Sequence, residues 1–207
     1  MTKASKTKQH YHHGDLKRAL LECALLVIAE QGTSKLTLRE IARRAGVSHA
    51  APYRHFANKS ELLGAVAAHA FRTLKEFLEA KLEDRTDKLE QFETLCLGYV
   101  QFAAQFPDHF QLMFESELPQ KSDHLELREA SRASYQILVD VVSECQALGL
   151  LRSGEAEELA LTAWSMSHGL AVLFVDKQLV IRTPQELDDI VRMSARNLFI
   201  GLRSTRS

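Results

Sequence analysis

The chain has 207 residues, of which 45% are hydrophobic and 26% are charged, and its formal net charge is -1. This composition is ordinary for a soluble globular protein, and the length allows one well-buried domain or a small domain joined to a larger one. The N-terminal stretch is polar and basic, and no run of about 18 apolar residues occurs. We therefore expect no signal peptide, no membrane-spanning helix and a cytoplasmic location.

Charge is distributed unevenly along the chain. Residues 1–56 carry 10 Lys and Arg against 4 Asp and Glu, whereas residues 57–207 carry 16 against 23. A basic first part followed by an acidic remainder is typical of a protein that meets a polyanion at one end only.

Neither the cysteines nor the clustered histidines form a clear site. Cys23, Cys96 and Cys145 are far apart and show no CxxC or Cys/His spacing. We expect three reduced, packed thiols, with a redox sensor as the alternative. The segment 10–13, His-Tyr-His-His, has no Cys or carboxylate partner and makes a poor closed metal site. No metal and no cofactor are expected.

The first helices can be read from their start and stop signals. Nearly every segment has helical period and none alternates like a strand, so we expect an all-α fold with about nine helices. Residues 1–13 are expected to form a flexible basic arm, and residues 14–31 the first helix, which stops at Gly32. The segment 37–40, Thr-Leu-Arg-Glu, is a capping box, in which each end bonds the other, and it predicts the start of the second helix.

The later helices follow from similar signals. Ser48 can cap a short third helix, after a left-handed turn at Gly46. The segment 58–61, Asn-Lys-Ser-Glu, predicts a long fourth helix that runs to about Asp84. Further helices are expected over residues 87–106, 107–117, 123–148, 154–180 and 183–203. The last of these opens with Thr-Pro-Gln-Glu, a capping box with proline at the first helical position.

Residues 37–59 have the outline of a helix-turn-helix reader of duplex DNA. The second helix must present short side chains to enter a major groove about 12 Å wide. Such side chains are those of Ser48, His49, Ala50 and Ala51. Groups placed to hold phosphates are Tyr53, Arg54, His55 and Lys59. A solvated helical hairpin is the alternative, but the combination of capping box, tight turn and basic aromatic segment favours DNA binding.

The sequence TLREIARRAGVSHAAPYRHFANKSELL, with the amphipathic helix before it, resembles the tetracycline-repressor (TetR) family of bacterial regulators over about residues 16–71. The resemblance implies a three-helix DNA-binding head on a helical body that binds a small ligand and dimerises. It implies that base edges are approached by Arg39, His49, Ala50 and Tyr53, and phosphates by Thr37, Ser48, His55 and Lys59. Pro52 departs from the aliphatic residue usual there, so the third helix can begin one residue late.

Three parts are therefore expected: an arm over residues 1–13, a DNA-binding domain over 14–60, and a ligand-binding and dimerisation domain over 61–207. The helix at 154–180 is apolar over a wide arc, which indicates burial from more than one direction. A homodimer interface is expected from residues of this helix and the last one, namely Met166, Gly169, Leu170, Leu173, Ile190, Val191, Ser194 and Leu198.

The sequence also suggests a pocket for an unknown small-molecule ligand. Trp164 and His168-Gly169 resemble the W…HG signature of one C-terminal domain type in the TetR family, and a hydrogen-bonded core histidine is the alternative. Aromatic residues are more often plain core, but apolar pockets with few polar groups are typical of ligand sites. The candidate lining residues are Phe71, Phe102, Phe110, Met113, Phe114, Trp164 and His168.

The expected function is a ligand-responsive homodimeric repressor that binds a near-palindromic operator in double-stranded DNA. The alternative is an architectural DNA-binding protein without a small-molecule inducer. An enzyme is not expected, because the sequence has no Ser/His/Asp arrangement on suitable elements, no Gly-rich phosphate loop and no set of metal ligands.

Overall fold

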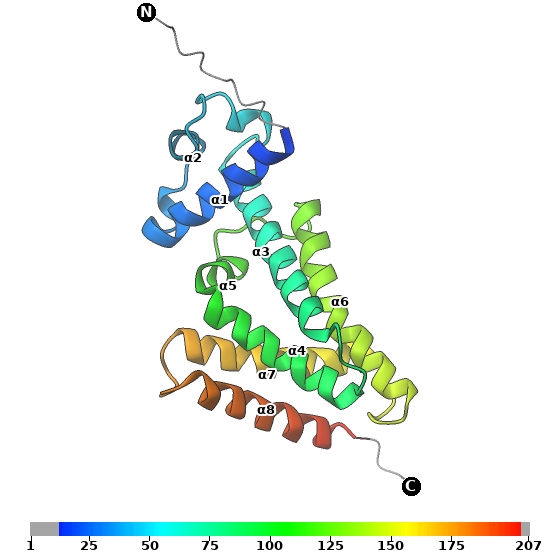
Figure 1. Ribbon diagram of the computed structural model, residues 1–207. Coiled ribbons are helices and arrows are strands. Elements are labelled where there is room, and N and C mark those ends of the chain that lie inside the picture. The colour runs from blue at the N-terminus through cyan, green and yellow to red at the C-terminus, as the bar shows by residue number, and fades with distance from the viewer. Residues whose placement is uncertain (1–12, 204–207) are drawn as a thin grey trace, which may run out of the picture. The chain divides into compact units, whose positions relative to one another are not determined.

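The structure, a computed structural model, describes residues 13–203 (Figure 1). Within this range it contains eight α-helices and two 3-10 helices, and no strand beyond an isolated bridge between Leu151 and Arg203. The expected all-α fold class is confirmed. The α-helices are α1 (His13–Gln31), α2 (Leu38–Arg44), α3 (Lys59–Leu82), α4 (Lys88–Gln105), α5 (Pro107–Met113), α6 (Leu125–Ala147), α7 (Ala156–Val175) and α8 (Pro184–Gly201). The 3-10 helices are η1 (Thr33–Lys35) and η2 (Pro52–Arg54).

Side-chain caps fix the starts of several helices. The hydroxyl of Thr37 accepts from the backbone N–H of Glu40 at 3.1 Å, and the hydroxyl of Thr183 accepts from that of Glu186 at 3.2 Å. The Glu186 carboxylate reaches back to the backbone N–H of Arg182 at 2.8 Å. Each bond satisfies a backbone donor that the first turn of a helix leaves without a partner. The predicted starts of α2 and α8 are confirmed.

Two helix ends differ from the expectation. α5 stops at Met113 instead of near residue 117, because Phe114 leaves the helical conformation. α7 stops at Val175 instead of Val180, because Lys177 adopts a φ of +56° and the N–H of Gln178 bonds back to the carbonyl of Leu173 at 2.8 Å. This is a left-handed C-terminal turn, which closes a helix by satisfying its last carbonyls.

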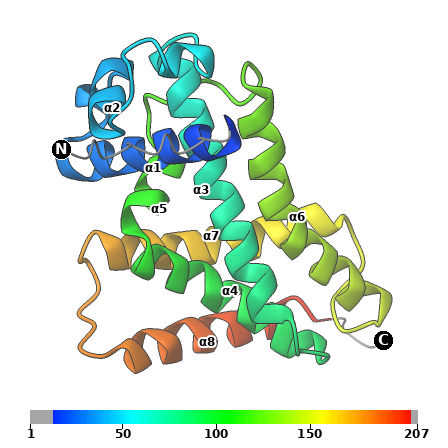
Figure 2. The same cartoon turned by 45° about the horizontal axis from the view of Figure 1, so that its top comes forward.

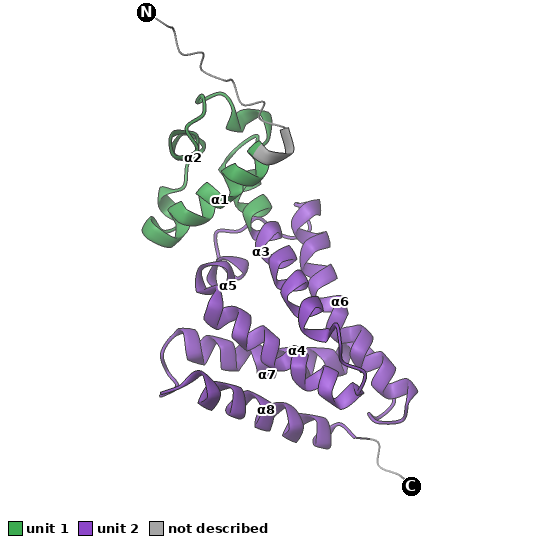
Figure 3. Cartoon of the chain, in the orientation of Figure 1, with its two compact units in different colours: residues 1–66 green, residues 67–207 purple. Residues whose placement is uncertain are grey.

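Contacts divide the chain into two compact units, residues 1–66 and 67–207 (Figure 3). The boundary falls within α3, so this helix contributes to both units. Unit 1 holds α1, α2, η1, η2 and the start of α3. Its buried core is apolar and comes from all three α-helices and the segments between them, through Leu20, Ala24, Val27, Leu36, Ile41 and Leu62.

In unit 2, α4 is the central helix and packs against α5, α6, α7 and α8 (Figures 1 and 2). Its buried face includes Phe92 and Phe102, both fully buried. Glu93 on α4 is only 3% exposed, and its carboxylate accepts from Arg196 of α8 at 2.7 Å. A buried charge is tolerated only with such a partner, so this ion pair fixes α8 against α4.

Among the described helices, α7 alone is long and apolar enough to cross a membrane by length and composition. It packs against α4, α6 and α8. The residues that it buries recur every three or four positions, which places them on one face: Leu159, Ala160, Ala163, Ser167 and Ala171. This buried face of α7 contributes to the core of unit 2.

Candidate DNA-binding surface and ligand cavity

The three arginines of α2 have different surroundings. The carboxylate of Glu40 accepts from Arg43 at 2.6 Å and from Arg44 at 3.0 Å, and Arg44 also contacts Glu30 of α1 at 2.5 Å. Hydrogen bonds from Arg43 and then Arg44 lower the pKa of Glu40 to about 2. Arg39 is exposed and has no ion-pair partner within residues 13–203. It is therefore the arginine of α2 whose guanidinium group is available to an external anion.

The segment after α2 is a turn followed by η2, and the expected α-helix from Ser48 is wrong. The backbone N–H groups of Ala51, Arg54 and His55 each bond the carbonyl three residues earlier, which is the 3-10 pattern. Pro52 has no N–H to bond the Ser48 carbonyl, so the first α-helical hydrogen bond cannot form there. Ser48 does not act as the expected cap, because η2 begins at Pro52 and its N-cap residue is Ala51, with no side-chain cap.

A tight turn links α2 to this segment. Gly46 has a φ of +66°, which a residue with a Cβ rarely adopts. The next N–H, of Val47, bonds the carbonyl of Ala42 at 3.0 Å and closes the turn. Pro52 and Phe56 are buried and anchor the far end of the segment.

Most side chains predicted to contact DNA lie at the surface of unit 1. The exposed ones are Thr37, Arg39, Ser48, His49, Ala50 and Tyr53, and the half-buried ones are Ala51, His55 and Lys59. Tyr53 is 53% exposed, an unusual degree of exposure for an aromatic ring. Exposed residues of this kind meet the requirement for contact with DNA, and the roles assigned to them stay predictions.

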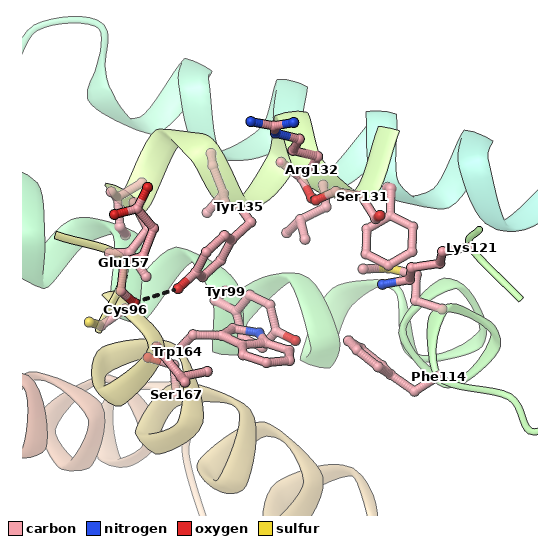
Figure 4. Close-up of a pocket in the computed structure, with 18 of the residues that line it drawn as sticks. Cys96, Tyr99, Phe114, Lys121, Ser131, Arg132, Tyr135, Glu157, Trp164 and Ser167 are labelled. Atoms are coloured by element: carbon pink, nitrogen blue, oxygen red, sulfur yellow. Dashed lines mark hydrogen bonds between the residues drawn. The ribbon is translucent and has the colours of Figure 1, made fainter. Parts of the chain in front are cut away.

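Unit 2 contains a cavity of about 510 Å³, which we call the main cavity (Figure 4). Residues of five helices, α3 to α7, line it. Its lining includes five aromatic side chains, those of Phe71, Tyr99, Phe114, Tyr135 and Trp164. Sites for small organic ligands are typically apolar clefts of roughly 300 to 1,000 Å³ with a few polar groups, so this cavity has the size and lining of a ligand site.

Three cationic side chains also line the main cavity. Lys121 lies between α5 and α6, and Arg128 and Arg132 lie one turn apart on α6. The ammonium group of Lys121 is 5.0 Å from the centre of the Phe71 ring and points into the cavity (Figure 4). Partial burial of this ammonium group lowers the pKa of Lys121. Sequence reasoning missed these residues, although Arg128, Arg132 and Tyr135 recur at helical spacing on one face of α6.

A second cavity of about 430 Å³ is lined by the His168 and Phe114 rings. The two ring centres are 4.5 Å apart. Nδ1 of His168 is 2.9 Å from the hydroxyl of Tyr99, which lines the main cavity. Burial lowers the pKa of His168 and raises that of Tyr99. His168 is thus a hydrogen-bonded side chain that is uncharged at neutral pH and lines the second cavity, and Phe114 lines both cavities.

The aromatic residues predicted to line a pocket are divided among three places. The main cavity is lined by Phe71, Met113, Phe114 and Trp164, and the second by Phe110, Phe114 and His168. Phe102 lines neither cavity. Its ring is fully buried in the core of unit 2, with ring centres 5.7 Å from Phe77 and 5.2 Å from Phe106.

The residues predicted to form a dimer interface are likewise only partly at the surface. Leu173 is exposed, and the half-buried ones are Met166, Gly169, Leu170, Ile190, Ser194 and Leu198. Val191 is fully buried in the core of unit 2, so it is not available to a second subunit. Sequence reasoning missed three exposed apolar side chains on α7 and α8, those of Leu161, Met193 and Ile200.

The remaining predictions concern the arm, the histidines and the cysteines. The basic arm with Lys3, Lys6 and Lys8, and the cluster at residues 10–12, lie outside the described residues. Cys96 and Cys145 are buried free thiols, and burial raises the pKa of Cys96 to about 12 and that of Cys145 to about 11. Thiols with such pKa values are almost fully protonated at neutral pH and react slowly.

The sequence matches two family models. Residues 20–66 match the model of bacterial regulatory proteins of the tetR family, and residues 92–198 match the tetracyclin repressor-like C-terminal domain. The HTH-type transcriptional regulator BetI of Rhizobium meliloti (strain 1021) is 32% identical over 161 residues, which is 75% of this chain and 76% of BetI. The nucleoid occlusion factor SlmA of Sodalis glossinidius (strain morsitans) is 24% identical over 186 residues, 87% of this chain and 93% of SlmA.

A solved structure shares the fold of this chain over nearly its whole length. A protein of unknown function from Rhodococcus sp. RHA1 superposes with a TM-score of 0.79 at 33% identity, and the match covers 95% of this chain and all of that one. The two family models together account for both units, and BetI aligns over most of its own length. The chain therefore belongs to the tetracycline-repressor (TetR) family of helix-turn-helix transcriptional regulators.

Proposed function

We propose that the protein is a homodimeric, cytoplasmic repressor that binds a near-palindromic operator and releases it when a small molecule occupies the main cavity. It acts by binding and not as an enzyme. The observation that carries this proposal is the pairing of a tetR-type DNA-binding segment in unit 1 with an apolar cavity of about 510 Å³ in unit 2. The bases would be read by Arg39, His49, Ala50 and Tyr53, and the phosphates held by Thr37, Ser48, His55 and Lys59.

The dimer is supported by the exposed apolar side chains of α7 and α8, Leu173, Met193 and Ile200. Exposed apolar surface on a soluble protein is typical of contact surfaces. Two DNA-binding units related by a two-fold axis would bind two half-sites roughly 34 to 36 Å apart, or a multiple of that distance. This is why the expected operator is near-palindromic.

Regulation by a ligand requires thermodynamic coupling between the two sites. If the ligand binds the DNA-free state more tightly, DNA must weaken ligand binding by the same factor. The test is to measure operator affinity by fluorescence anisotropy with and without each small molecule that binds the main cavity. A fall in affinity at saturation supports the proposal. An operator affinity that stays unchanged at saturation with every such ligand would overturn ligand-responsive regulation.

A second candidate is an architectural DNA-binding protein that spreads on DNA and has no inducer. The likeness to SlmA, a nucleoid occlusion factor, over most of the chain favours it. The main cavity argues against it, because a protein without a small ligand has no need of such a space. Many occupied chromosomal sites without a regulated promoter would favour this second candidate.

A further inference from the structure

The charges around the main cavity have one predominant sign. Its lining includes three cations, Lys121, Arg128 and Arg132, against one carboxylate, that of Glu157. In the part of the chain that the structure describes, none of the three cations has an ion-pair partner. Glu126 lies close to them in the sequence, but its carboxylate is held by Arg72 of α3 at 2.8 Å. The cavity is therefore electropositive on this side.

The three cations come from adjoining parts of the fold. Arg128 and Arg132 are four residues apart on α6, so their side chains lie on the same face of the helix. Ser131 of α6 also lines the cavity and adds a hydroxyl (Figure 4). Guanidinium and hydroxyl groups donate to carboxylate and phosphate oxygens, and a guanidinium can do so with two parallel bonds. These groups can thus bind the head of an anion.

Other residues that line the cavity are apolar. They include Leu74 and Leu78 of α3 and Leu95 of α4, and all three side chains are buried. Tyr135 cannot offer its hydroxyl proton freely here, because it donates to the backbone carbonyl of Glu157 at 3.1 Å. A ligand in contact with these leucines would need an apolar body, because polar groups buried against them would lose their hydrogen bonds with water.

We infer that the ligand of the main cavity is an amphipathic anion, with an apolar body and a carboxylate or phosphate head held by Lys121, Arg128 and Arg132. The inference deepens the proposed function and rests on its assignment of this cavity to the ligand. An aromatic lining by itself would also suit a quaternary ammonium ion, through contact with the ring faces. The excess of positive charge opposes such a ligand and favours the anion.

Trp164 provides the readout, because it is the only tryptophan of the chain and lines the main cavity. Its fluorescence is followed while the full chain is titrated with decanoate, decyl phosphate, decanol and decyltrimethylammonium, which share one tail. Both anions are expected to bind about tenfold more tightly than decanol, a difference of about 1.4 kcal/mol, and the ammonium most weakly. The ratio of decanoate to decyl phosphate affinity tells which head the site prefers.

The test variant carries both Arg128→Gln and Arg132→Gln, and the control variant carries Arg152→Gln. Arg152 is exposed and lines neither described cavity. The double variant is expected to bind decanoate and decanol equally, whereas the control keeps the preference. Far-UV circular dichroism checks that each variant folds, and Lys121→Gln replaces the double variant if that one does not. Equal binding of anion and alcohol by the unaltered chain, tighter binding of the ammonium, or no binding of either anion would overturn the inference.

Operator affinity is measured in the same samples. This separates a failure of the inferred ligand class from a failure of the proposed ligand-responsive function. Preferential binding of an anion without a change in operator affinity supports the ligand class and contradicts ligand-responsive regulation. Release of the operator by decyltrimethylammonium, but by neither anion, leaves the proposed function in place and overturns the ligand class.

Discussion

The hydroxyl of Tyr99 on α4 lies 2.9 Å from Nδ1 of His168 on α7, and this bond joins the two helices between the main and second cavities. Tyr99 is buried and His168 is half-buried, and burial raises the pKa of Tyr99 and lowers that of His168. A buried polar group that loses its partner keeps its desolvation cost without the compensating bond.

Replacing Tyr99 by Phe is expected to lower the free energy of unfolding by about 1 kcal/mol, because His168 loses its partner in a partly buried place. Urea denaturation measures the change. The matched control is Tyr135→Phe, which removes a bond to the more exposed Glu157 carbonyl. The control should lose less stability. Equal losses in the two variants would contradict the special cost assigned to the Tyr99–His168 bond.

Stability is expected to fall as the solution is acidified. Burial lowers the pKa of His168 below the ordinary value of 6.5, and burial and then the charge of His69 lower that of His109. The unfolded chain takes up these protons first, so the stabilisation is complete above about pH 6.5 and is lost as the pH falls towards the folded pKa values. Thermal denaturation at about pH 7.5 and 5.5 measures this loss.

The contribution of His168 can be separated with one variant and one control. His168→Gln should show a smaller loss of melting temperature on acidification than the unaltered chain. His49→Gln changes an exposed histidine and should keep the full loss. The same loss in all three proteins would show that His168 is not responsible.

Two arginines of α2 form a matched pair for DNA binding. Arg39→Ala is expected to weaken operator binding by about ten- to a hundredfold, in line with the roughly 1 to 3 kcal/mol that a base contact supplies. Arg43→Ala should have a smaller effect, because its guanidinium already binds Glu40 at 2.6 Å. Fluorescence anisotropy with labelled operator measures both. A larger loss from Arg43→Ala would reverse the assignment.

Tyr53→Ala is expected to abolish specific operator binding while leaving dimerisation and helicity unchanged. The ring is 53% exposed, so its removal costs the fold little. Anisotropy reports DNA binding, size-exclusion chromatography with light scattering reports the dimer, and circular dichroism reports helicity. Loss of the dimer in this variant would show that the residue is misassigned.

As the pH rises, anion binding in the main cavity should weaken at a lower pH than it would if Lys121 had the ordinary lysine pKa of 10.5. Burial lowers the pKa of Lys121 below 10.5, so its charge is lost as the pH rises through this lowered value. Decanoate affinity is compared at about pH 7.5 and 9.5, in the unaltered chain and in Lys121→Arg, because an arginine stays charged over this range. The variant should lose the pH dependence. An equal dependence in both proteins would exclude Lys121 as its source.

Local signals in the sequence predicted much of the fold. The hydroxyls of Thr37 and Thr183 each accept a hydrogen bond from the backbone N–H three residues later in the chain. Because this bond depends on neighbouring residues alone, the sequence is enough to mark these two helix starts. The sequence also showed that Pro52 is unusual at its position, but not which helix type forms there. The residues before Pro52 form a hydrogen-bonded turn, and the segment continues as the 3-10 helix η2 and not as an α-helix. Periodicity does not distinguish these two outcomes over so few residues.

The cavity was much harder to predict than the helices. Trp164 and Phe71 were expected to line a pocket, whereas Phe102, of the same chemical character, is fully buried in the core. Whether an aromatic ring meets another ring or an empty space depends on how helices pack, which a single sequence does not reveal. Arg128 and Arg132 are exposed, and helical spacing alone does not reveal that they also line a cavity.

The central claim, that this chain recognises a specific operator, is tested most directly by selecting bound duplexes from sheared DNA of the source organism at two salt concentrations. Non-specific attraction to phosphates weakens steeply with salt, whereas base contacts add affinity that persists. We expect one near-palindromic sequence to be enriched and to survive the higher salt. Diffuse binding that disappears at the higher salt would contradict the claim and would favour the architectural alternative.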